Sequence, residues 1–176
     1  MKAAEIYLKV IMDLLSSGIL ESVGTVEHAI VEGNHFLYYD IETLGNGGVQ
    51  NYLLTIPDDD NSYHLLLDLS GTAITQFELY EDTDKTGSVL KTTYNSNRNS
   101  AKVSAMTVHK GITDGSTDGT LLKIYKGGSA TNRSRAASSI GTATEMILKN
   151  GSKYILRLTS YTADNITSVR LWWYTT

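Results

Sequence analysis

Apolar and polar residues alternate along most of the chain from Gly33 onward, in short runs separated by polar segments. Alternation with a period of two is typical of β-strands that bury one face and expose the other. The segments between the runs are rich in Gly, Asn and Asp, which favour tight turns. The pattern predicts strands at 35–43, 50–56, 63–70, 73–81, 88–95, 102–109, 120–126, 143–149, 153–160 and 167–174.

These short strands and frequent turns define the fold class that we expect. Asn150-Gly151 joins two alternating runs and is a strong signal for a two-residue hairpin. Beyond the N-terminus no second helical pattern stands out. We therefore predict an all-β fold, an antiparallel β-sandwich or jelly roll with an N-terminal α-helix. Residues 26–176 would form the sandwich domain.

The N-terminal segment 1–22 has a different periodicity. Residues 2–17 carry polar side chains at spacings of three and four, which predicts a helix, and Gly18 is a plausible end. The remaining circumference is almost entirely apolar, which is more than a helix on one protein surface needs. The helix either packs under a loop of its own domain or is covered by its own sheet and another subunit. The candidate contact residues are Ile6, Val10 and Leu14.

The C-terminal strand predicts which of two neighbouring tryptophans is buried. Trp173 shares a face with two apolar residues, Val169 and Leu171, whereas Trp172 alternates with them. We therefore expect Trp173 in the core, and Trp172 and Tyr174 on the opposite face. There they would stack on a sugar, anchor an interface or lie under the N-terminal helix.

Length, composition and charge narrow the functional classes. A chain of 176 residues fits one domain, and the absence of Cys excludes disulfides and thiolate chemistry. The net charge of -4 argues against a nucleic-acid partner, which would require clustered Lys and Arg. The sequence lacks the long uninterrupted apolar stretch that a secretory signal or a membrane span requires, so we predict neither.

The sequence contains no recognisable catalytic motif. The four His lack the close spacing of metal ligands, and no nucleophile elbow or phosphate-binding loop is present. The turn 82–87 imitates the start of a calcium loop, but Thr93 stands where the bidentate Glu belongs. We expect a non-enzymatic protein without catalytic residues, metal or cofactor. A calcium site, or a hydrolytic site assembled from distant residues, remains a minor alternative.

Three arginines in polar loops are candidate contacts for an acidic partner surface, because the guanidinium group makes forked, charge-assisted hydrogen bonds. They are Arg98, Arg133 and Arg135; the alternative is that they are simply solvated. The segments 132–134 and 165–167 match the acceptor pattern for N-glycosylation. Without a predicted secretory route, we assign no function to either match.

Three stretches together resemble a protein family. They are His28-Ala29-Ile30 with Gly33-Asn34-His35-Phe36, the run Asn95-Ser96-Asn97-Arg98-Asn99-Ser100, and the C-terminal run from Glu145 to Tyr174. The pattern resembles small virion structural proteins of tailed bacteriophages, of the head-decoration or cement type, and covers roughly residues 26–176. The resemblance implies a β-sandwich bound in many symmetric copies to an assembled shell, with no catalytic residues.

The expected function follows from this resemblance. It is a structural virion protein that decorates and stabilises a phage capsid by binding between shell subunits. Its partners would be the major capsid protein shell and itself, as a dimer or trimer, but neither nucleic acid nor membrane. It would be assembled in the host cytoplasm and located in the virion. The alternative is a carbohydrate-binding β-sandwich module of a phage fibre that uses Trp172 and Tyr174.

Overall fold

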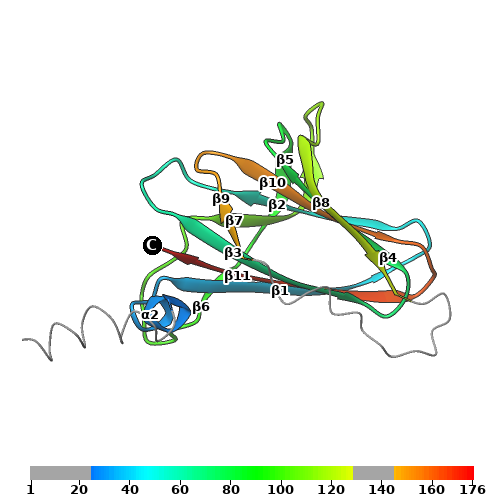
Figure 1. Cartoon of the computed structure of the whole chain (residues 1–176). Helices are drawn as coiled ribbons and strands as arrows, with labels where there is room; N and C mark the ends of the chain where they lie inside the picture. The colour runs from blue at the N-terminus through cyan, green and yellow to red at the C-terminus, as the bar shows by residue number, and fades with distance from the viewer. Residues whose placement is uncertain (1–24, 129–144) are drawn as a thin grey trace, which may run out of the picture.

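Two antiparallel sheets packed face to face form the body of the protein (Figure 1). The computed structural model describes residues 25–128 and 145–176, and the predicted helix at 2–17 lies outside these residues. One sheet has five strands in the order β6-β1-β11-β3-β9, and the other has six in the order β5-β7-β2-β10-β4-β8. The prediction of an all-β sandwich is confirmed.

Alternation located most of the strands close to their observed positions. The five-stranded sheet consists of β1 (His35–Leu44), β3 (Tyr63–Gly71), β6 (Tyr94–Asn95), β9 (Met146–Leu148) and β11 (Asn165–Thr175). The six-stranded sheet consists of β2 (Val49–Thr55), β4 (Thr75–Glu81), β5 (Thr86–Lys91), β7 (Thr107–Thr113), β8 (Thr120–Gly127) and β10 (Lys153–Ser160).

Two predicted strands differ from the structure because the chain changes sheet. The predicted strand 88–95 is divided between β5 in the six-stranded sheet and β6 in the five-stranded sheet. The predicted strand 102–109 begins later, as β7, and continues to Thr113. A period-two pattern reports which residues alternate, but it does not report which sheet each residue joins.

The core lies between the inner faces of the two sheets. Val169, Leu171 and Trp173 are buried there, as the alternation in the last strand predicted. Tyr154, Leu156 and Leu158 contribute from β10 in the opposite sheet. The sandwich therefore closes around side chains from strands that are central in their sheets.

A short helix that the sequence did not predict precedes β1. Helix α2 (Thr25–Val31) contacts β1 and β11 at one end of the sandwich (Figure 1). Gly33, two residues beyond its end, has a φ of 72°, and Asn34 N–H donates to Ala29 O at 2.7 Å. This is the hydrogen-bonding pattern of a glycine-terminated helix. Seven residues are too few for their periodicity to be recognised, although Gly33 is a stop signal.

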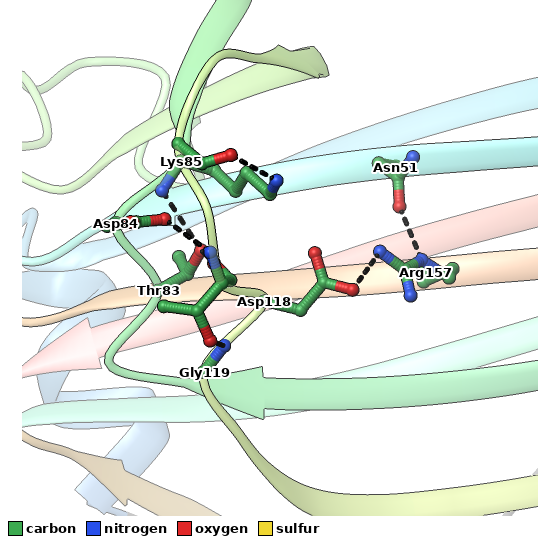
Figure 2. Close-up of polar contacts among 9 residues, drawn as sticks. Asn51, Thr83, Asp84, Lys85, Asp118, Gly119 and Arg157 are labelled. Atoms are coloured by element: carbon green, nitrogen blue, oxygen red, sulfur yellow. Dashed lines mark hydrogen bonds and ion pairs between the residues drawn. The ribbon is translucent and has the colours of Figure 1, made fainter.

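Loops of the same chain lie against the outer face of the six-stranded sheet (Figure 2). Arg157 on β10 donates to Asp118 in the β7–β8 loop at 2.7 Å and to Asn51 on β2 at 3.0 Å. Lys153 Nζ donates to the carbonyl of Lys85 in the β4–β5 loop at 3.2 Å. Leu53 and Ile155, which alternate with the inner-face residues of β2 and β10, are also buried.

Asp84 ties these two loops to each other. Its carboxylate accepts hydrogen bonds from the backbone N–H groups of Thr117 and Ser116, each at 2.9 Å, and from the Ser116 hydroxyl at 2.8 Å. The backbone donors lower the pKa of Asp84 to about 2, because they stabilise its charged form. The neighbouring Asp82 pairs with Lys149 at 2.7 Å. In the turn that resembled a calcium loop, both carboxylates thus hold chain segments together.

We expect Asp84→Asn to lower the stability of the folded protein at neutral pH. We also expect the stability of the variant to change less as the pH falls. Because the folded-state pKa of Asp84 lies below the ordinary value of 3.8, its contribution is present above about pH 4 and is lost as pH falls toward about 2. Thermal unfolding between pH 7 and pH 2.5 should show the two proteins converging in acid. Asp60→Asn, in another loop, is the matched control. A constant difference at every pH would contradict the assignment.

Strand β8 forms one edge of the six-stranded sheet, and residues 120–126 are all exposed. Leu121 and Ile124 are among its exposed apolar side chains. The strand also carries Lys123 and Lys126 and shifts register against β4. Lysines and irregular register are features that protect sheet edges from pairing with other chains.

Candidate functional site

The outer face of the five-stranded sheet carries a group of apolar and aromatic side chains. The pairing register places Tyr94, Leu37, Trp172 and Leu66 directly opposite one another across β6, β1, β11 and β3. Tyr39 lies two residues after Leu37 and therefore shares its face. We call these five residues the aromatic face.

The aromatic face is accessible in the part of the chain that the structure describes. Tyr39 is 61% exposed and Tyr94 is 41% exposed, and Ile41 extends the apolar surface along β1 at 65%. Leu37, Leu66 and Trp172 are half-buried between their neighbours. Contiguous apolar surface of this kind marks an interaction site more often than scattered single residues do. The corresponding face of the six-stranded sheet is the one that its own loops overlie.

A polar loop, residues 95–100, is fixed beside the aromatic face. Asn95 Nδ2 donates to the carbonyls of Gly33 at 2.8 Å and Lys102 at 3.1 Å, and its Oδ1 accepts from Asn97 N–H at 2.9 Å. Asn97 in turn donates to Val31 O at 3.0 Å, which attaches the loop to α2. These side-chain hydrogen bonds give the loop one conformation without regular secondary structure.

Gly33 permits the close approach between α2 and this loop. Besides its positive φ, a Cβ atom at this position would collide with the Ser100 side chain. Two independent reasons therefore require glycine at this position: its backbone conformation and the lack of space for a side chain. The residues from two of the stretches that prompted the family resemblance meet here, although that contact does not identify a family.

Arg98 extends from the loop over the aromatic face. Its guanidinium carbon lies 5.8 Å from the centre of the Tyr94 ring, within the range of a cation–π interaction. The Tyr94 and Tyr39 rings are themselves 6.3 Å apart and inclined by 22°. Arg98 forms no ion pair within residues 25–128 and 145–176, whereas Arg170 pairs with Asp68 at 3.4 Å. Arg98 therefore brings a positive charge to the edge of an apolar surface.

Tyr174 does not contribute to this surface, which corrects the expectation that it is exposed. Only 3% of it is accessible, and its ring stacks on His64 at 4.5 Å and on His35 at 6.5 Å. Its hydroxyl donates to Glu145 at 2.5 Å. Burial and the neighbouring Glu145 raise the pKa of Tyr174 to about 12. Tyr174 is a structural residue at the end of the sheet that α2 contacts.

The structure brings two of the sequence-predicted contact residues to one surface. Arg98 and Trp172 flank the same strand, because Leu37 on β1 pairs with both Tyr94 and Trp172. The other predicted residues, Ile6, Val10, Leu14, Arg133 and Arg135, lie outside the described residues. The sequence pattern did not predict Tyr39, Tyr94 or Leu66 as contact residues, since their proximity depends on strand order.

A separate charged cluster lies between the sheets near the far end of β1. Lys110 on β7 pairs with Asp40 at 2.8 Å and also with Glu42, and the Tyr52 hydroxyl donates to Asp40 at 2.9 Å. Burial alone would raise the pKa of Asp40, but its hydrogen bonds to Lys110 and Tyr52 lower it below the usual range. The charged groups of this cluster are paired with one another inside the protein.

In residues 25–128 and 145–176, no three His, Asp or Glu side chains converge in a way that would hold a metal ion. None of the helices described combines the length and hydropathy of a membrane span. The aromatic face with Arg98 is the candidate functional site.

Comparison with known proteins gives no family assignment: no family model, no curated protein and no solved structure matches this chain.

Proposed function

We propose that this chain is a non-enzymatic virion protein that decorates a phage capsid and binds the shell through its aromatic face. The observation that carries the proposal is a group of exposed and half-buried apolar and aromatic side chains beside the Arg98 guanidinium. Its assignment to a phage capsid rests on the family resemblance described above.

The composition of the aromatic face suits a protein interface. Tyr, Trp and Arg are enriched among the residues that dominate binding energies, particularly where apolar neighbours exclude water around them. Tyr39, Trp172 and Arg98 come from three different segments but occupy one surface. The hydrogen bonds that fix residues 95–100 reduce the conformational entropy that binding would otherwise cost.

Many copies on a symmetric shell would bind more tightly than one copy does. We propose that the protein acts as a homo-oligomer, a dimer or a trimer, in which each subunit presents its aromatic face to neighbouring capsid subunits. Linked binding sites raise the overall affinity without any new contact, provided that the geometry allows simultaneous engagement. Modest affinity at each face would then be sufficient.

The test is a binding assay with capsid shells assembled without the protein. We expect the double variant Tyr39→Ala/Trp172→Ala to bind at least about 30-fold more weakly, because one strong contact residue typically contributes about 2 kcal/mol. Bound protein is measured by co-sedimentation over a range of concentrations. Circular dichroism and thermal unfolding verify that the variant folds.

The matched control is Leu121→Ala/Ile124→Ala, which removes exposed apolar side chains from β8 in the other sheet. It should bind shells as the unmodified protein does. Equal losses in the two variants would indicate non-specific adhesion, and unimpaired binding of the Tyr39/Trp172 variant would exclude the aromatic face as the docking surface.

The carbohydrate-binding alternative loses one of its two proposed stacking residues. Tyr174 is buried and cannot form a sugar platform with Trp172. Tyr39 and Tyr94 provide accessible rings on the same face as Trp172, so glycan binding would use these rings in place of Tyr174.

A further inference from the structure

A shallow pocket lies between the aromatic face and the fixed loop. Its volume is about 410 Å³, and it is open to solvent on one side. Tyr39 and Tyr94 form apolar walls, Leu37 lies beside them, and Arg98 is at the rim. Asn95 and Ser96 complete the lining. The pocket therefore combines aromatic surface with one formal charge.

The polar groups of the loop are mostly engaged within the protein. The amide of Asn95 donates to two carbonyls and accepts one backbone N–H, as described above. Ser96 Oγ is 2.6 Å from His35 Nδ1. These internal contacts leave the loop's amide and hydroxyl acceptors with little capacity for a ligand.

The Arg98 guanidinium and two Tyr hydroxyls remain available to a ligand. Arg98 uses one nitrogen in a long hydrogen bond of 3.5 Å to Asn95 O, and a guanidinium carries five N–H donors. The Tyr39 and Tyr94 hydroxyls contact no hydrogen-bonding partner within the described residues and are also able to donate. Among the described residues, no Asp or Glu lines the pocket. A guanidinium without a neighbouring carboxylate to neutralise it favours an anionic ligand over a neutral sugar.

We infer that this pocket binds a carboxylate, an Asp or Glu side chain from a protein surface, with the apolar part of that segment packed on Tyr39 and Tyr94. The forked guanidinium of Arg98 matches the two oxygens of a carboxylate, and its position over the Tyr94 ring restricts its orientation. That this protein surface belongs to a capsid subunit rests on the proposed function. The preference of the pocket for a carboxylate is independent of that function.

A pair of small probes tests the pocket directly in the full-length protein. Phenylacetate carries a carboxylate beside an aromatic ring, and phenylacetamide is its neutral counterpart. We expect phenylacetate to shift the NMR signals of the Tyr39 and Tyr94 rings and the Arg98 side chain at about 10-fold lower concentration than phenylacetamide does, since hydrogen bonds to charged groups contribute more than neutral ones.

Variants identify the residue responsible for this preference. Arg98→Gln should abolish the preference for the carboxylate, and Arg98→Lys should retain only part of it, because a lysine lacks the forked geometry. Lys123→Gln, on β8 of the other sheet, is the control and should leave the preference unchanged. Signals from the inner core verify that each variant is folded.

Four results would overturn the inference. These are equal binding of the acid and the amide, a preference that survives Arg98→Gln, stronger shifts with methyl glucoside than with phenylacetate, and equal shifts with inorganic phosphate. The last would indicate an unspecific anion site.

Binding to shells separates this inference from the proposed function. If the protein fails to bind shells but prefers phenylacetate through Arg98, the proposed function fails and the carboxylate site stands. If shells bind Arg98→Gln with unchanged affinity, the docking function stands, but the pocket is not the site of its carboxylate contact.

Discussion

Trp173→Ala is expected to lower the free energy of unfolding by about 3–5 kcal/mol, the usual range for removing a large aromatic side chain from a core. Trp173 is completely buried, and its ring stacks on Phe36 at 6.1 Å. Its indole N–H donates to Ser104 Oγ at 3.0 Å, and the substitution also removes this hydrogen bond. The expected loss is a large part of the ~5–15 kcal/mol that stabilises an ordinary domain.

The neighbouring tryptophan provides the control for this prediction. Trp172→Ala should cost about 1 kcal/mol, because Trp172 is only half-buried on the outer face. Denaturant unfolding of the two variants gives the comparison. A larger loss at Trp172 would show that residues outside the described ranges cover the outer face, and equal losses would contradict the assignment of the two faces.

Asn165→Ala is expected to cost about 3 kcal/mol, although the side chain is polar. Asn165 is fully buried at the start of β11. Its Oδ1 accepts from Ala73 N–H at 2.9 Å, and its Nδ2 donates to Thr75 Oγ1 at 2.8 Å and Ser160 Oγ at 3.0 Å. One amide thus joins the β3–β4 turn to the end of β10, and its removal leaves a buried N–H without an acceptor.

Asn46→Ala, in the exposed turn after β1, is the matched control and should change stability by less than about 0.5 kcal/mol. Equilibrium denaturation measures both variants. A loss below about 1 kcal/mol for Asn165→Ala would mean that water or a rearranged turn replaces the amide. Asn165, the acceptor position of one glycosylation match, is thus buried and hydrogen-bonded in the folded chain.

The strands were predictable because each has one face in a shared core. In the second half of β11 the inward positions are apolar, so Val169, Leu171 and Trp173 identified the strand and its buried face together. For Tyr174 the alternation gave the wrong prediction. It follows the outward alternation, but stacking on His64 and contact with Glu145 bury it. Side chains that belong to other strands determine its exposure.

The candidate site was predictable only in part. Arg98 attracted attention as a cation in a polar loop and Trp172 as an outward aromatic residue, but the sequence did not indicate that they share a surface. That relation depends on β1 lying between β6 and β11, which is a property of strand order. Likewise, the burial of Ile155 depends on the arrangement at the outer face of its sheet, which alternation along β10 does not encode.

The positions of the last two strands determine when the molecule is able to fold during its synthesis. β11 lies between β1 and β3, and β10 lies between β2 and β4, so both sheets receive a central strand from the C-terminal end of the chain. In a growing chain on the ribosome, β1 and β3 therefore lack β11, and β2 and β4 lack β10. Such unpaired strand edges invite aggregation, and their non-local pairing is slow. The sandwich is completed only when β10 and β11 have been synthesised, so a chain truncated before Lys153 would lack the centre of both sheets.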